Sequence, residues 1–181
     1  MIVLIGFMGA GKTTVGQLLS GQLGLPFLDA DAVVEERAGC PVPQIFAERG
    51  EPVFRELEHE TIAGLLAGDS GPRIVLALGG GAVEDARTRR LLVAADVVYL
   101  HVPYAGALAR IGGDAGRPML SRPDLEGVYR RRLAAYQAVA THTVRTDGRA
   151  PADVCGEIVS RLGVGGSAPH RLTFIYQPNV R

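Results

Sequence analysis

The stretch GFMGAGKTT, residues 6–14, lies between a short apolar run and a helix-length segment near the start of the chain. Residues 6–13 fit the pattern G-x-x-x-x-G-K-S/T, and a position after a strand and before a helix is the context in which this pattern binds phosphate. Glycines let backbone N–H groups converge on an anion, and the following helix adds its positive N-terminal end. The stretch therefore predicts a nucleoside triphosphate site made by Gly9, Ala10, Gly11, Lys12, Thr13 and Thr14.

Lys12 is the only lysine in a chain with 19 lysine and arginine residues. An ammonium on a flexible stem fits between β- and γ-phosphates as a point charge, whereas a planar guanidinium is larger and directional. Thr13 supplies the hydroxyl that Mg²⁺ binds beside the phosphates. The alternative interpretation is a glycine-rich turn that binds nothing. The complete motif in its context favours phosphate binding.

Composition indicates one folded domain. The 181 residues are 47% apolar and 21% charged, and their formal net charge is zero. We therefore expect no general affinity for nucleic acid or membrane surfaces.

The first apolar run breaks at Gly6, too early for a signal peptide, and no apolar stretch approaches the roughly 20 residues of a membrane span. Cys40 and Cys155 are isolated, which predicts free thiols and a reducing compartment. We expect a cytoplasmic monomer.

Short strand-like runs alternate with longer helical patterns along the chain. The expected strands are residues 2–5, 26–29, 73–78, 96–102 and 141–146. The expected helices are residues 12–24, 31–38, 52–67, 84–94, 125–140 and 151–162. This alternation predicts an α/β fold in which a parallel sheet carries helices on both faces.

Two segments depart from this alternation. Residues 105–124 are rich in glycine, proline and arginine and show little apolar periodicity, which by itself is typical of a solvated loop. The residues after Gly163 begin like a linker. Their apolar part, LTFIY, is compatible with an edge strand, a segment docked on the surface or an addition outside the fold.

Two aspartates follow the second expected strand. Ligands of parallel α/β sheets bind beyond the carboxyl ends of the strands, and strand alternation points Asp29 and Asp31 the same way. Asp29 suits a Mg²⁺-bound water or a general base. Asp31 is equally compatible with a second role, capping the helix that follows.

Three further features are individually weak. Gly79, Gly80 and Gly81 follow an apolar strand, which indicates that backbone approaches a ligand or another chain segment there. Arg55 lies near Glu56 and Glu58, and Arg132 lies in a basic run. Taken alone, such arginines usually belong to solvated helix faces.

Together, the segments GFMGAGKTTVG, DAD, IFAERGEPVFRELE, LALGGGAV, GRPML and RRLAAY resemble the shikimate kinase family in identity and order. The resemblance covers about residues 1–162. It implies a three-layer P-loop NTPase fold with a five-stranded parallel sheet, a domain over residues 1–163 with a lid at about 105–124, and a tail over 164–181 of unknown role. The implied activity is ATP-dependent phosphorylation of the 3-hydroxyl of shikimate, a step toward aromatic amino acids that requires Mg²⁺.

The resemblance also assigns roles to residues. The catalytic residues would be Lys12, Asp29 and Arg117, with Arg117 on the lid. The substrate would be bound by Asp31, Arg55, Gly79, Gly80, Gly81 and Arg132. Beyond the phosphate loop, the nucleotide would be bordered by Arg110, Arg117, Arg149 and Pro151. Mg²⁺ would be held by Thr13 and, through water, by Asp29.

Three other functions are also compatible with the phosphate loop. Another small-molecule P-loop kinase, for gluconate or a nucleoside monophosphate, should lack the combination of Asp31, Arg55 and the glycine triplet. A nucleotide switch usually carries an NKxD motif, which is absent because Lys12 is the only lysine. A protein that binds nucleotide without turnover is disfavoured by the intact Lys12, Thr13, Asp29 and Arg117.

Overall fold

The computed structural model describes residues 1–67, 73–111 and 124–164. Its five strands form one sheet in the order β2-β3-β1-β4-β5, and every neighbouring pair is parallel. The strands are β1 (Ile2–Ile5), β2 (Phe27–Asp29), β3 (Val75–Ala77), β4 (Asp96–His101) and β5 (His142–Arg145). The predicted α/β fold is confirmed.

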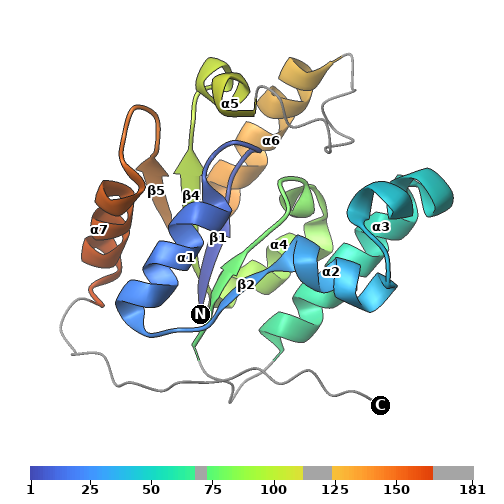
Figure 1. Ribbon diagram of the computed structural model, residues 1–181, viewed down its shortest axis with the longest axis horizontal. Coiled ribbons are helices and arrows are strands. Elements are labelled where there is room, and N and C mark those ends of the chain that lie inside the picture. The colour runs from blue at the N-terminus through green and yellow to red at the C-terminus, as the bar shows by residue number, and fades with distance from the viewer. Residues whose placement is uncertain (68–72, 112–123, 165–181) are drawn as a thin grey trace.

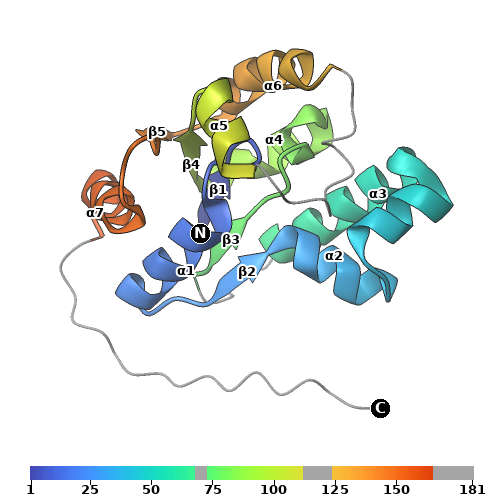
Figure 2. The same ribbon diagram turned by 45° about the horizontal axis from the view of Figure 1, so that its top comes forward.

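Helices cover both faces of the sheet, which gives three layers (Figure 1). The α-helices are α1 (Lys12–Leu23), α2 (Ala30–Ala38), α3 (Val42–Leu66), α4 (Ala86–Leu91), α5 (Tyr104–Ile111), α6 (Leu125–Val139) and α7 (Pro151–Leu162). In Figure 2, α1 and α7 lie on one face, α4 and α6 lie on the other, and α2 and α3 extend beyond β2. Among the described residues, no helix is long and apolar enough to cross a membrane.

The central strands are apolar because the helical layers bury them on both sides. Every residue of β1 and β3 is buried, and so is the middle of β4. On the α6 side, the ring of Tyr99 from β4 stacks on Tyr136 at a centroid distance of 5.1 Å. The sheet is therefore a rigid support for the loops that follow its strands.

The strand register brings three of these loops to one level. Leu4 of β1 pairs with Ala77 of β3, and Ala77 pairs with Asp29 of β2. The phosphate loop begins at Gly6, two residues beyond Leu4, while Asp31 and Gly79 each lie two residues beyond their paired strand residues. The carboxyl ends of three strands therefore deliver the motifs of the predicted site side by side.

Two helices differ from the sequence-based prediction. Helix α3 begins at Val42 rather than at residue 52 and continues through a non-helical Gly50, where φ is 82° and ψ is 165°. Gly50 and Pro52 are residues that usually end a helix, but here helical turns form on both sides of Gly50. The expected helix at 84–94 is divided into η1 (Ala82–Glu84), α4 and η2 (Leu92–Ala94).

The first part of the segment expected as a loop or lid is helical. Helix α5 spans Tyr104–Ile111 and buries Ala107 and Ile111, which lie four residues apart on one face. A repeat of only two turns is too short to stand out among glycines and prolines. Residues 112–123 of the same segment lie outside the described part of the chain.

Gly6 shows why the phosphate loop requires glycine at its first position. Its φ is +150°, and a Cβ atom at this residue would lie 2.6 Å from the backbone oxygen of Leu100 in β4. Because that oxygen belongs to a central strand, it cannot move aside cheaply. Because Gly6 has no Cβ, the backbone of the phosphate loop can pass directly against β4 as it leaves β1.

We expect Gly6→Ala to lower the free energy of unfolding by about 2–4 kcal/mol, because it combines backbone strain with a backbone clash. Urea titration followed by circular dichroism measures this change. Gly21→Ala in α1 is the matched control, since a Cβ there meets nothing within 4 Å. The control should stabilise the protein by about 0.5–1 kcal/mol. Equal effects of the two substitutions would contradict this explanation.

Candidate active site

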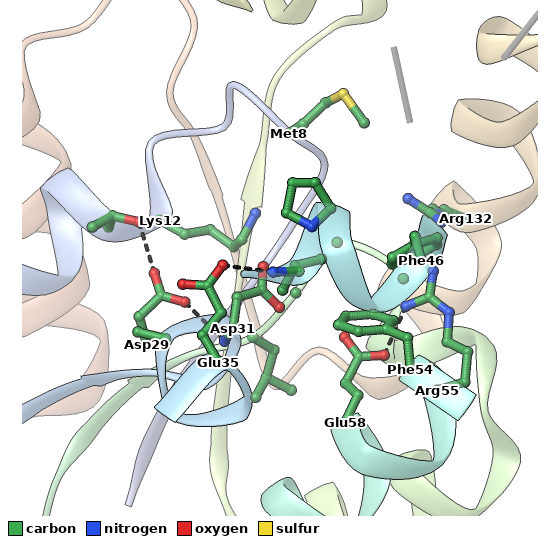
Figure 3. Close-up of a pocket in the computed structure, with 18 residues that line it drawn as sticks. Met8, Lys12, Asp29, Asp31, Glu35, Phe46, Phe54, Arg55, Glu58 and Arg132 are labelled. Carbon is green, nitrogen blue, oxygen red and sulfur yellow. Dashed lines mark hydrogen bonds and ion pairs between the residues drawn. The ribbon is translucent and has the colours of Figure 1, made fainter. Parts of the chain in front are cut away.

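A cavity of about 430 Å³ opens at the carboxyl ends of β1, β2 and β3 (Figure 3). Residues from separate parts of the sequence line it, and most of the predicted substrate and catalytic residues are among them. The predicted residues in its lining are Lys12, Thr13, Asp29, Asp31, Arg55, Gly79, Gly80, Gly81 and Arg132. The lining also contains residues that the sequence did not single out, above all Glu35, Glu58, Phe46 and Phe54.

The phosphate loop leads directly into α1, whose first residue is Lys12. Gly9 and Gly11 both have positive φ, which turns the backbone into the concave shape that binds anions. The Nζ atom of Lys12 donates to the oxygens of Gly6 at 2.9 Å and Phe7 at 3.3 Å. The loop's own carbonyls thus hold the ammonium over the mouth of the loop, where a phosphate would arrive.

Asp29 connects the phosphate loop to the second strand. The hydroxyl of Thr13 donates to Oδ2 of Asp29 at 3.0 Å, and the N–H of Asp31 donates to Oδ1 of Asp29 at 3.1 Å. Asp29 is therefore the N-cap of α2, and the interpretation of Asp31 as the capping residue is wrong. Capping by Asp29 leaves the side chain of Asp31 available to the cavity.

Thr13 and Asp29 bring a hydroxyl and a carboxylate together, and both are oxygen donors that suit Mg²⁺. No group of three or more histidine, cysteine, aspartate or glutamate side chains in the described ranges is arranged to hold a metal ion. Mg²⁺ commonly keeps its waters and binds through one or two protein groups together with substrate phosphates. The residues present fit that kind of site.

Gly79 makes room for two buried carboxylates. A Cβ atom at Gly79 would lie 2.6 Å from Oδ1 of Asp31 and would collide with Oε1 of Glu58. Within the described part of the chain, these two oxygens are buried and have no hydrogen-bond partner. The glycine triplet therefore approaches charged side chains, which is one of the two possibilities that the sequence left open.

Burial raises the pKa of both carboxyl groups. For Asp31 the neighbouring charge of Asp29 adds to the effect of burial, whereas for Glu58 the ion pair with Arg55 opposes it. Removing a carboxylate from water disfavours its charged form unless donors satisfy it. Asp31 and Glu58 both line the cavity, and acceptors without a partner suit a ligand that brings hydroxyl donors.

Arg55 lies in α3 between two acidic partners. Its Nη1 atom donates to Oε2 of Glu58 at 2.7 Å, and its Nη2 atom donates to Oε1 of Glu51 at 3.1 Å. The guanidinium packs against Gly81, where any Cβ would overlap it, and lies 5.2 Å from the ring centroid of Phe54. Arg55 is thus fixed at the cavity wall rather than free on a solvated face. The spacing of Arg55 and Glu58, three residues apart on one helix, was the available signal for the role of Glu58.

Arg132 is even more enclosed, with a side chain that is 3% exposed. Its Nε and Nη2 atoms donate to Oε2 of Glu84 at 2.8 and 2.7 Å. The interpretation of Arg132 as part of a solvated basic face is therefore wrong. In Figure 3, Arg55 and Arg132 lie together on one side of the cavity, and Lys12, Asp29 and Asp31 lie on the other.

A second cavity of about 300 Å³ adjoins the phosphate loop. The predicted nucleotide residues in its lining are Gly9, Ala10, Gly11, Thr14, Arg110, Arg149 and Pro151. Arg110 donates to the oxygen of Gly9 at 3.1 Å and to the hydroxyl of Thr146 at 3.0 Å, which connects the loop to the end of β5. Thr146 was not identified from the sequence because a single threonine after a strand carries no distinctive signal.

Arg117 and most of the predicted lid lie outside the described residues, as do residues 165–181 of the predicted tail. The assignment of Arg117 to the transferring phosphate therefore stays a prediction. Helix α7 ends at Leu162 and is capped by Gly163, and the domain boundary expected at residue 163 stays a prediction.

The amino-acid sequence matches a known protein family. The family model for shikimate kinase matches residues 8–163. A shikimate kinase of Thermobifida fusca is 46% identical over 92% of this chain and 96% of its own, and one of Salinispora arenicola is 48% identical over 88% and 96%.

A solved structure agrees with these sequences. The shikimate kinase of Acinetobacter baumannii in complex with shikimate superimposes with a TM-score of 0.82 at 37% identity, covering 89% of this chain and 91% of that one. The chain belongs to the shikimate kinase family.

Proposed function

We propose that this chain transfers the γ-phosphoryl group of ATP to the 3-hydroxyl of shikimate, giving shikimate 3-phosphate and ADP in the pathway to aromatic amino acids. The observation that carries the proposal is the meeting of two cavities at one phosphate loop. One cavity contains paired arginines and unsatisfied carboxylate oxygens, and the other contains the predicted nucleotide residues.

The larger cavity has the chemistry that shikimate needs. Shikimate carries one carboxylate and three hydroxyls, so it requires cationic donors at one end and acceptors at the other. Arg55 and Arg132 lie in the same wall and would bind the carboxylate. Oδ1 of Asp31 is buried without a partner in the described part of the chain and would accept from ring hydroxyls. Backbone N–H groups of Gly79, Gly80 and Gly81 would contact substrate and phosphate.

The smaller cavity would take the base and ribose of ATP. Arg110, Arg149 and Pro151 border it, together with Gly9, Ala10, Gly11 and Thr14 of the phosphate loop. The same loop contains Lys12, so the two cavities are adjacent. Arg149 is fixed by the backbone oxygens of Arg145 and Asp153 at 3.0 and 3.2 Å. A fixed guanidinium offers a flat surface against which an adenine can stack.

Phosphoryl transfer requires mainly alignment and neutralisation of charge. Lys12 would contact the β- and γ-phosphates, and Arg117 would contact the group in transfer. Thr13 would hold Mg²⁺ directly and Asp29 would hold it through water; the ion, when bound, supplies charge neutralisation at the phosphates. Asp29 and Asp31 line this cavity with Lys12, and either carboxylate could accept the proton of the attacking hydroxyl.

We further propose that the enzyme acts as a monomer in the cytoplasm. The two cavities contain every predicted site residue that lies in the described part of the chain, so the proposed reaction requires none of these from a second copy. Cys40 and Cys155 are free thiols, which suits a reducing compartment.

We predict that Lys12→Arg abolishes turnover although it keeps the positive charge. The loop carbonyls of Gly6 and Phe7 accept from one compact ammonium, and a guanidinium is too large for the same place. Coupled measurement of ADP release with saturating ATP, Mg²⁺ and shikimate tests this, with circular dichroism to check the fold. A folded Lys12→Arg variant with near-normal kcat would refute the explanation for the single lysine.

We expect Arg55→Ala and Arg132→Ala each to weaken shikimate binding while ATP binding stays nearly unchanged. Loss of one partner from a desolvated charge pair costs about 2–5 kcal/mol. Calorimetric titration with each ligand separates the two effects. If ATP affinity falls and shikimate affinity does not, these arginines serve the nucleotide and the carboxylate assignment is wrong.

A further inference from the structure

We propose that Glu84 is a positioning residue for the substrate's carboxylate. It holds the Nε and Nη2 edge of Arg132 from outside the cavity, so that the remaining Nη1 corner is presented to the ligand. This inference rests on the proposed function, because it assumes that Arg132 binds the carboxylate of shikimate.

The first observation is the asymmetry in exposure of the pair. The side chain of Arg132 is 3% exposed, while that of Glu84 is 40% exposed. Arg132 lines the substrate cavity, and Glu84 is absent from the lining found for it among the described residues. Glu84 therefore reaches the guanidinium from the solvent side, behind the wall of the cavity.

The second observation is which atoms are used. A single oxygen of Glu84, Oε2, accepts from both Nε at 2.8 Å and Nη2 at 2.7 Å. Two donors that converge on one charged oxygen hold that edge of the guanidinium toward Glu84. The Nη1 corner lies on the other side and faces Gly80, where a Cβ would be 3.6 Å away. A carboxylate arriving in the cavity meets that corner without displacing Glu84.

The third observation is that the contact between Arg132 and Glu84 is one of two bonds that join α6 to the segment from Gly80 to Glu84. Arg132 and Tyr136 lie four residues apart in α6 and therefore on one face of the helix. Tyr136 donates its hydroxyl to the oxygen of Gly80, and Arg132 donates to Glu84, which lies four residues after Gly80 in η1. The two bonds fix α6 against the glycine triplet and the turn that follows it. Glu84 thereby links the arginine to the backbone that lines the substrate cavity.

A competing role for Glu84 would be to occupy the arginine and weaken substrate binding. The geometry opposes this role, because Glu84 is absent from the described lining of the cavity and leaves the Nη1 atom beside Gly80 without contacting it. Its loss would leave a long, flexible side chain to be ordered again when shikimate binds. The two roles predict opposite changes in shikimate affinity.

The test compares Glu84→Ala, Glu84→Gln and Arg132→Ala with the double variant Glu84→Ala/Arg132→Ala. Steady-state kinetics give KM for each substrate and kcat, and calorimetric titration gives the affinity for shikimate. Glu126→Ala is the matched control, since it removes an exposed ion pair with Arg130 on the same helix, 2.6 Å long. Thermal unfolding of each variant shows that it is folded.

We expect Glu84→Ala to raise the KM for shikimate by about 3- to 10-fold, the factor expected for ordering one rotamer-rich side chain. The KM for ATP and kcat should stay unchanged. Glu84→Gln should have a smaller effect because its amide oxygen still accepts from Arg132. The double variant should equal Arg132→Ala alone, since Glu84 acts only through that arginine. The Glu126→Ala control should equal the wild type.

An unchanged or lowered KM for shikimate in a folded Glu84→Ala variant would overturn the positioning role. An additional loss in the double variant would overturn it as well, because Glu84 would then act by another route. If Arg132→Ala itself leaves shikimate binding unchanged, the carboxylate assignment fails, and the inference fails with it.

Discussion

The parallel pairing of β3 with β1 on one side and with β2 on the other is the constraint on which the site depends. It places Leu4, Ala77 and Asp29 at one level, so the three loops that follow begin side by side. One loop supplies phosphate binding, one supplies Asp31, and one supplies the glycine triplet. Residues more than 70 positions apart in sequence, such as Gly6 and Gly80, meet for this reason. Because the strands are buried on both faces, this arrangement is rigid before any ligand binds.

Counter-ions explain how the cavity can hold several charges. Arg55 has Glu58 and Glu51, and Arg132 has Glu84, so neither guanidinium is buried alone. An uncompensated buried charge would be strongly destabilising, whereas a paired one is tolerated. The acidic side is satisfied less completely, since Asp31 and Glu58 each keep one oxygen without a partner in the described part of the chain. Hydroxyl donors of a ligand would complete that side.

The fold and the phosphate loop could be predicted from sequence because their signals are local. Apolar runs mark strands, and Gly6 to Thr13 form one continuous motif. Glu58 and Glu84 could not be assigned in this way. The contact of Glu58 with Arg55 lies within one helix, but a charged pair at this spacing resembles any solvated one. The contact of Glu84 with Arg132 depends on how α6 packs against η1, which no local pattern encodes. Helix α5 and the first turns of α3 were missed for a different reason: glycine or proline interrupts periodic patterns that are only a few turns long.

The most direct measurement is identification of the product. The wild-type protein is incubated with ATP, Mg²⁺ and shikimate, and the mixture is analysed by mass spectrometry, with phosphorus–proton coupling in NMR spectra to locate the ester. We expect shikimate 3-phosphate and ADP in equal amounts, with no phosphorylation of gluconate or of a nucleoside monophosphate offered instead. ADP without a phosphorylated shikimate, or a phosphate transferred to one of the other acceptors, would contradict it.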